Sequence, residues 1–206
     1  MISEREQSAA DARDIVGDDL VFIIDLQTLL ASPSTRAFKT FAKKHDPQAL
    51  RRLRLRLFMS YVEGVAAALK AEAVSLTSPS RSPAAHALLQ DKTFDLTDQG
   101  EPIERTFSPS LSRSLRFAFR MGALTKRLTV SPDYGGAGWK AFQEAVKLRN
   151  RITHPRRAED FVISDLEVAT LASAEEWFHT SYRDLMSADI VSLSRKLSVP
   201  QRRRRA

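Results

Sequence analysis

Arg149, Asn150 and His154 are the residues whose types and spacing point most clearly to chemistry, and they stand at the end of a predicted helix. Arg149 continues the 3-4 spacing of the apolar residues before it, so its guanidinium should project from, or beside, a buried face. Asn150 and His154 are four residues apart and therefore share a face. Pro155 ends the helix and places His154 in its C-terminal turn. We expect a cation, an amide and an imidazole to converge at one end of a helix.

These residue types suit the cleavage of RNA by attack of a 2′-hydroxyl on the neighbouring phosphorus. An imidazole titrates near pH 6.5, so His154 can accept or donate a proton at neutral pH. The guanidinium of Arg149 stays charged and offers a planar fork to phosphate oxygens. One histidine cannot easily take both proton-transfer roles at once, whereas two copies across a two-fold axis can, which favours a homodimer. We predict an endoribonuclease that needs no cofactor and no metal.

A structural interpretation of the same residues stays open. Arg149 could pair with a carboxylate such as Glu63, and His154 could cap the helix C-terminus, where the dipole favours a cation. The spacing alone does not decide, because Arg81 and His86 repeat it. That copy falls in a predicted Ser/Pro loop and no Asn follows its Arg, so the context favours the copy at Arg149 and His154.

Length and charge favour one basic globular domain with decorations. The 206 residues fit a single domain, for which the usual length is roughly 100–200 residues. The formal net charge is +7, and the run Arg202 to Arg205 supplies four of the positive charges. A basic chain fits a polyanionic partner such as RNA, and it fits equally a protein with a solvated basic end.

The absence of cysteine excludes disulfides, thiolate zinc sites and cysteine nucleophiles, and it fits a reducing compartment. The four histidines are scattered, so no metal-site pattern is seen. The apolar run at residues 20–24 is too short to span a membrane and lacks the features of a signal peptide. We therefore expect a cytoplasmic protein without a membrane partner.

The apolar periodicity predicts a mostly helical chain. The longest predicted helix covers residues 48–76, where Leu and Tyr recur at helical spacing and no Pro intervenes. The arginines near its start fit either a solvated face or an RNA-binding stripe. They are Arg51, Arg52, Arg54 and Arg56. Other helices are predicted over residues 20–31, 36–45, 110–129 and 139–153, and from residue 165 to at least residue 186.

A small β-hairpin is predicted at about residues 92–107, because two β-type runs flank the turn Asp98-Gln99-Gly100. Residues 77–85 are expected to form a Ser/Pro loop, and the run of glycines at 135–138 to form a flexible hinge. The predicted fold is all-α, an antiparallel four- to five-helix bundle with this inserted hairpin. An acidic segment (1–32) would precede the helical domain (33–190), and a basic tail (191–206) would follow it.

The segment Arg149–Pro155, with the sequence Arg-Asn-Arg-Ile-Thr-His-Pro, closely resembles the signature of the HEPN superfamily. That signature is an Arg, a polar residue, a short spacer and a His near the end of the penultimate bundle helix. The stretch at residues 59–64 is similar to an earlier helix of the superfamily. The hairpin and residues 160–165 are similar to bacterial HEPN-like proteins, so the resemblance covers residues 40–190 in layout.

The resemblance implies that Arg149 and His154 are the catalytic pair, that Asn150 supports them, and that the active cleft forms between two protomers. Arg151, Arg156 and Arg157 would then guide the RNA backbone by charge, an effect that falls steeply with salt. The superfamily includes toxin and defence ribonucleases, which makes an antitoxin-like protein a candidate partner. It also includes members without nuclease activity, so the alternative is a non-catalytic dimerisation, nucleic-acid-binding or partner-binding module.

Overall fold

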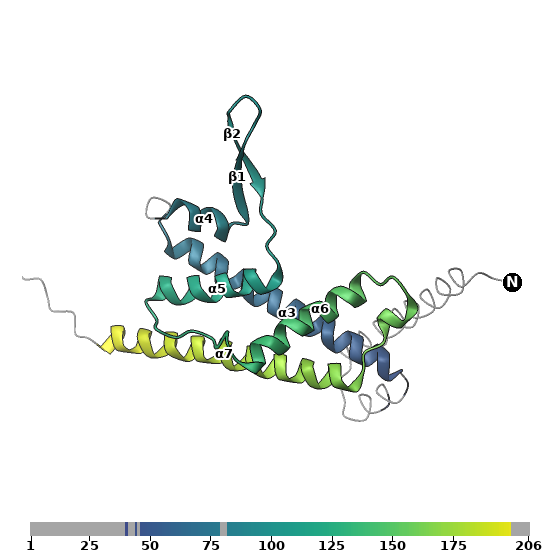
Figure 1. Cartoon of the computed structure of the whole chain (residues 1–206). Coiled ribbons are helices and arrows are strands. Elements are labelled where there is room, and N and C mark those ends of the chain that lie inside the picture. The colour runs from purple at the N-terminus through teal and green to yellow at the C-terminus, as the bar shows by residue number, and fades with distance from the viewer. Residues whose placement is uncertain (1–39, 41–43, 45, 79–81, 199–206) are drawn as a thin grey trace, which may run out of the picture. The chain divides into compact units, whose positions relative to one another are not determined.

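The computed structural model of the chain describes Thr40, Lys44 and residues 46–78 and 82–198. Within these residues the chain forms five α-helices and one antiparallel β-hairpin (Figure 1), which confirms the predicted all-α fold with a small inserted hairpin. The helix predicted at 20–31, the acidic segment and the end of the basic tail lie outside the described residues, as does the helix predicted at 36–45 except for Thr40 and Lys44. In the described part, no helix is long and apolar enough to cross a membrane.

The predicted elements begin and end close to the expected residues, except that α7 continues to Ser198 and so includes the start of the predicted basic tail (191–206). The observed elements are α3 (Pro47–Leu76), α4 (Pro83–Leu89), β1 (Lys92–Leu96), β2 (Pro102–Thr106), α5 (Leu111–Lys126), α6 (Ala137–Thr153), the 3-10 turn η1 (Ala158–Phe161) and α7 (Asp165–Ser198). Helix α5 ends three residues before the predicted Thr129, because Arg127 adopts a left-handed conformation with φ 59°. The N–H of Leu128 then donates to the carbonyl oxygen of Ala123 at 2.8 Å, which closes the helix end.

Helix α4 occupies part of the segment that was predicted to be a loop. Pro83 suggested a break, but it stands in the first turn of α4, where its missing N–H costs nothing and its fixed φ suits a helix. Two alanines and two leucines then continue the helix. The loop prediction was wrong for residues 83–85, because a proline can begin a helix as well as end one.

The chain divides into two compact units. The first contains the described residues up to Ser60 together with Lys140–Glu175, and the second contains Tyr61–Trp139 and the described residues from Glu176 onward. Both α3 and α7 therefore contribute one stretch to each unit. The candidate site falls entirely within the first unit.

The core of the first unit lies between the start of α3, the end of α6 and the start of α7. The rings of Phe58 and Phe142 meet edge to face with their centroids 6.4 Å apart. Other buried side chains of this unit are Leu55, Met59, Ala145, Leu148, Ile152, Phe161, Ile163, Leu171 and Ala174. Leu57, which the helical spacing in α3 also includes, is 56% exposed. The long apolar pattern of α3 therefore predicted the helix without showing which side is buried.

The arginines at the start of α3 connect this helix to residues more than a hundred positions away in the first unit. Arg54 makes two contacts to the Glu175 carboxylate, with Nε–Oε1 2.9 Å and Nη2–Oε2 2.5 Å, and this hydrogen bonding raises its pKa. Arg51 donates to the carbonyl oxygen of Ile163 at 2.6 Å and pairs with Asp165. Arg52 is only 3% exposed. These three arginines make contacts within the fold, so they do not form the exposed RNA-binding stripe that was one of the two interpretations.

The core of the second unit lies between the second half of α3, α5 and the second half of α7. A Cβ at Gly122 of α5 would stand 3.4 Å from Leu69 Cδ2 and 3.7 Å from Leu185 Cδ2, so the helices approach closely there. Lys126 Nζ lies between Glu72 and Asp189 at 2.9 and 2.6 Å, and is 9% exposed. A second cluster joins α3, α4 and α5 through buried Ala73, Leu89 and Met121.

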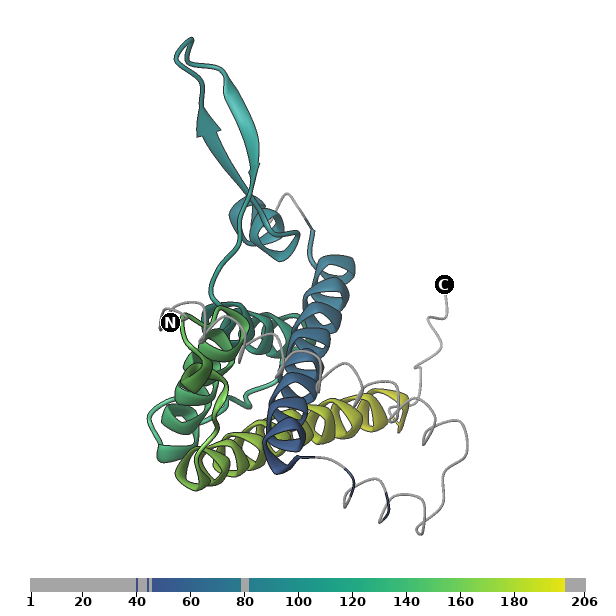
Figure 2. The ribbon, with the colours of Figure 1, turned by 90° about the vertical axis from the view of Figure 1, so that its right-hand side faces the viewer.

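The hairpin has the predicted turn. Its register runs from Lys92 opposite Thr106 to Leu96 opposite Pro102. Gly100 has φ 80°, a conformation that favours glycine, and its N–H donates to the Thr97 carbonyl oxygen at 2.9 Å. Figures 1 and 2 show the hairpin extending away from α4 and α5 of its own unit. The local sequence was sufficient here, since the turn chemistry and both strands lie within one short segment.

The glycine run before α6 forms a specific turn. The Asp133 carboxylate accepts hydrogen bonds from the N–H groups of Gly135 and Gly136 at 2.9 and 3.0 Å. A Cβ at Gly136 would lie 2.2 Å from Asp133 Oδ2, and one at Gly138 would lie 2.7 Å from Trp177 Cβ. Gly138 is needed for close packing against Trp177, whereas at Gly136 the flexible Asp133 carboxylate can move aside. The interpretation as a hinge did not anticipate the packing at Gly138.

Candidate functional site

Helix α6 carries the predicted site on its last turn, inside the first unit. The buried face of this part of α6 consists of Phe142, Ala145, Leu148 and Ile152. Arg149 lies beside this face and is half-buried, as the spacing predicted. The helix ends at Thr153, and the N–H of His154 donates the final backbone bond to the carbonyl oxygen of Asn150 at 3.0 Å. Pro155 lacks an N–H and cannot continue the helix.

Arg149 and Asn150 are in direct contact. Arg149 Nη1 donates to Asn150 Oδ1 at 3.2 Å, and the Thr153 hydroxyl donates to the Arg149 carbonyl oxygen at 2.7 Å. Asn150 and Thr153 are exposed, so both hydrogen bonds are open to water. The amide thus orients one edge of the guanidinium at the surface end of α6.

The imidazole of His154 is exposed one turn after Asn150. Among the described residues it forms no hydrogen bond or ion pair, and its backbone N–H is the group that joins it to α6. The structure therefore places the three predicted residues at the same end of α6, with His154 one turn after Asn150 and just outside the helix. It brings only Arg149 and Asn150 into hydrogen-bond contact within one copy of the chain.

Arg151, which was predicted to guide RNA, makes its contacts within the fold. Its Nη2 donates to the carbonyl oxygen of Val162 at 2.7 Å, and its Nη1 pairs with Glu167 Oε1 at 2.8 Å. Its Nε is buried and has no hydrogen-bond partner in the structure. The Glu167 carboxylate offsets the charge of Arg151. The hydrogen bond to Val162 attaches the end of α6 to the connection before α7.

Arg156 and Arg157, the other two predicted RNA contacts, are exposed on the segment between α6 and η1. Their backbone N–H groups donate to Asp160 Oδ2 at 2.7 and 3.1 Å. These bonds, with that from Arg156 the strongest, lower the pKa of Asp160. Asp160 therefore orders the segment that carries both arginines, while their side chains face solvent.

A capping box at the start of α7 supports this arrangement and was missed in the sequence. The Ser164 N–H and hydroxyl donate to Glu167 Oε2 at 2.8 and 2.9 Å, and the Glu167 N–H lies 3.3 Å from the Ser164 hydroxyl oxygen. The Ser-x-x-Glu spacing was the available signal. Partial burial acts to raise the pKa of Glu167, but the hydrogen bonds from Ser164 and Arg151 outweigh it and the net shift is downward.

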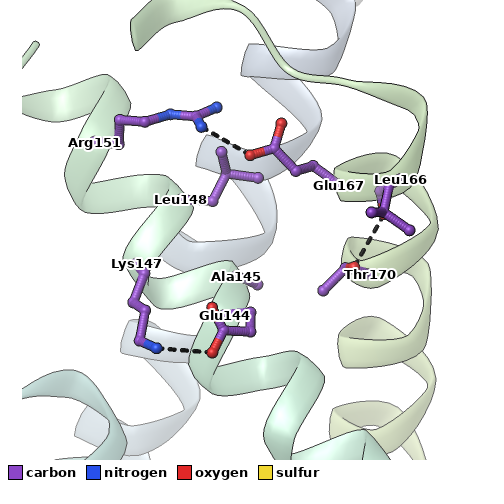
Figure 3. A pocket seen from close by; sticks show the side chains of 8 residues that line it. All are labelled: Glu144, Ala145, Lys147, Leu148, Arg151, Leu166, Glu167 and Thr170. Atoms are coloured by element: carbon purple, nitrogen blue, oxygen red, sulfur yellow. Dashed lines mark hydrogen bonds and ion pairs between the residues drawn. The ribbon is translucent and has the colours of Figure 1, made fainter.

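A groove of about 300 Å³ runs between α6 and α7 on the side of α6 that carries Arg151 (Figure 3). Ala145 and Leu148 supply apolar surface, and two ion pairs line it, Arg151 with Glu167 and Lys147 with Glu144. The charges balance, so the groove has no net electrostatic preference for an anion or a cation. The candidate catalytic groups of the first unit are therefore those at the end of α6 and not the paired charges of the groove.

The end of α6 thus offers a cation for phosphate oxygens, an amide that orients it, and an exposed imidazole for proton transfer. In the described residues, no three His, Cys, Asp or Glu side chains gather as a metal site would require. Comparisons of the chain with models of protein families, with curated proteins and with solved structures find no match.

Proposed function

We propose that the chain is a metal-independent endoribonuclease of HEPN type, with Arg149 and His154 as its catalytic residues. The observation that carries the proposal is the composition of the last turn of α6. There the Arg149 guanidinium is held by Asn150 at 3.2 Å, and the exposed imidazole of His154 follows at the same helix end. The resemblance of residues 149–155 to the HEPN signature supports the same assignment.

In the proposed reaction one imidazole takes the proton of a ribose 2′-hydroxyl, and the oxygen attacks the adjacent phosphorus. The bond from phosphorus to the 5′-oxygen breaks, and a protonated imidazole supplies a proton to that leaving oxygen. Arg149 stabilises the negative charge that accumulates on the phosphorane. The products are a 2′,3′-cyclic phosphate and a 5′-hydroxyl end.

Two copies of His154 serve the two proton transfers better than one, so we propose a homodimer with both sites in one cleft. Arg156 and Arg157 add positive charge near His154, whereas the charge of Arg151 is shared with Glu167. A ribonuclease of this kind would act in the cytoplasm as a toxin or defence effector, and an antitoxin-like protein would restrain it.

The test is the cleavage of mixed cellular RNA by the purified chain in EDTA. We expect the wild type to leave cyclic phosphate ends, and His154→Ala and Arg149→Ala to cut at least about 100-fold more slowly. His86→Ala is the matched control, because Arg81 and His86 repeat the spacing of the site. Circular dichroism and light scattering would show whether each variant is folded and dimeric.

An inactive wild type, or equal cleavage by wild type and both site variants, would remove the catalytic proposal. The chain would then be better described as a non-catalytic binding or dimerisation module in which Arg149 and Asn150 stabilise the end of α6. A wild type that cuts RNA but stays monomeric at all concentrations would contradict only the two-copy mechanism.

A further inference from the structure

The outer face of α5 carries a line of arginines that the proposed ribonuclease site does not use. The α5 arginine stripe consists of Arg113, Arg116, Arg120 and Arg127, the last of these being the residue that ends the helix. Their spacing of three, four and seven residues places them on one side of α5. All four are exposed. Helix α5 contains no Asp or Glu, so nothing on the helix itself offsets their charge.

Most of this stripe is electrostatically unpaired. Within the part of the chain that the structure describes, the side chains of Arg113, Arg120 and Arg127 form no ion pair or hydrogen bond. Lys126 on the same helix turns inward and binds Glu72 and Asp189. Neighbouring like charges three and four residues apart destabilise a helix slightly. The repulsion within the stripe therefore lowers the stability of the fold slightly, and a bound anion would relieve this repulsion.

Arg116 is held in a defined position by aromatic rings. Its guanidinium carbon lies 4.5 Å from the centroid of the Tyr134 ring and 5.0 Å from that of Trp139. Burial raises the pKa of Tyr134 to about 12, so the phenol stays neutral beneath the cation. Stacking uses the flat face of a guanidinium and leaves its N–H edge able to bind phosphate oxygens.

The dimensions and composition of the stripe fit the phosphate backbone of a nucleic acid. From Arg113 to Arg127 the helix advances roughly 21 Å at 1.5 Å per residue, which is long enough to follow several consecutive phosphates of a nucleic-acid strand. Helix α5 has no Asn or Gln to read adenine and no Asp or Glu to read cytosine, whereas its arginines can bind phosphate oxygens in any sequence. A protein partner would need an apolar centre, and Leu124 is the single large apolar side chain of α5 that is clearly exposed.

We propose that the α5 arginine stripe is a sequence-independent binding surface for the backbone of RNA. The choice of RNA as the nucleic acid rests on the proposed ribonuclease function. The stripe uses none of the residues proposed for cleavage. It would raise the local concentration of substrate on the chain, an effect that weakens as salt increases.

The test is the binding of a fluorescent single-stranded RNA of mixed sequence to the full chain carrying His154→Ala, measured by anisotropy at several salt concentrations. We expect Arg113→Gln with Arg120→Gln to weaken binding about tenfold at 0.1 M salt and to lower the slope of log affinity against log salt by about 1.4. Arg105→Gln with Arg183→Gln is the control with the same charge change, since both arginines are exposed and lie near Asp95 and Asp184. This control should bind within about twofold of the parent chain.

Equal affinity and salt slope for the stripe variant and the control would overturn the proposal. So would loss of all binding when Arg202 to Arg205 become Gln, or displacement of the RNA by polyglutamate at equal charge concentration. Wild-type RNA cleavage is measured in parallel. A chain that binds RNA through the stripe but never cuts it refutes only the ribonuclease, whereas a chain that cuts RNA and binds it without the stripe refutes only this surface.

Discussion

Arg151 on the last turn of α6 and Glu167 on the first turn of α7 form an ion pair, with Nη1 and Oε1 2.8 Å apart. Figure 3 shows this pair. The other end of the Arg151 guanidinium binds the carbonyl oxygen of Val162, and the other oxygen of Glu167 accepts from Ser164. One arginine thus joins two helices and the connection between them in the first unit. The turn that carries Arg149 and Asn150 is held by these contacts.

Replacing Arg151 by Ala should lower the free energy of unfolding by about 1–2 kcal/mol, because a partly buried carboxylate and a carbonyl lose a charged donor. Urea unfolding followed by circular dichroism measures the change. Lys147→Ala is the control, since Lys147 and its partner Glu144 are 72% and 57% exposed, and an exposed pair contributes less than about 0.5 kcal/mol. Equal losses for the two variants would show that the Arg151 contacts do not support the fold.

Glu167 should make stability depend on pH in acid. Its folded-state pKa is lower than its ordinary value of 4.5, so the folded chain binds this proton less tightly than the unfolded chain. The stabilisation is fully present above about pH 4.5 and is lost as pH falls through the lower folded-state pKa. Denaturant unfolding between pH 6 and 3 should show this loss, and Glu167→Gln should make the curve flatter. A steeper curve for the variant would contradict the assignment.

Asp160 should protect the segment that follows His154. With Asp160→Asn, the backbone N–H groups of Arg156 and Arg157 lose a carboxylate acceptor, so we expect their amide hydrogens to exchange several-fold faster. Hydrogen exchange followed by NMR measures this at single residues. Glu159→Gln should leave both rates unchanged, because Glu159 is exposed and lies 4.0 Å from Arg157 Nε. No difference between the two variants would mean that Asp160 does not order the segment.

Two glycines should respond to alanine with opposite signs. A Cβ at Gly138 would lie 2.7–3.0 Å from Trp177 side-chain atoms, so Gly138→Ala should destabilise the chain by about 1–3 kcal/mol. Gly64 in α3 has no atom within 4 Å of the added carbon, and Gly64→Ala should stabilise it by about 0.5–1 kcal/mol. Thermal unfolding of both variants measures the two shifts. Shifts of the same sign would contradict the packing at one of the two positions.

The elements that the sequence predicted well are those whose signals are local. The turn at Gly100 and the start of α7 at Asp165 depend on residues within a few positions of each other. Helix α4 was missed because Pro83 can end one element or begin another, and only packing against α3 and α5 selects between them. In α3 the helical spacing was clear, but apolar side chains occur on several sides, so its buried face could not be assigned.

The types of the candidate site residues and their place at one helix end were determined by the sequence alone, because α-helical periodicity and Pro155 act over single turns. The partners of the arginines were decided only by the tertiary structure. Arg54 meets Glu175 across 121 positions, whereas Arg113 and Arg120 meet no carboxylate in the described chain. A guanidinium reaches only a few ångströms, so whether it is bound or available depends on which distant segments the fold brings beside it.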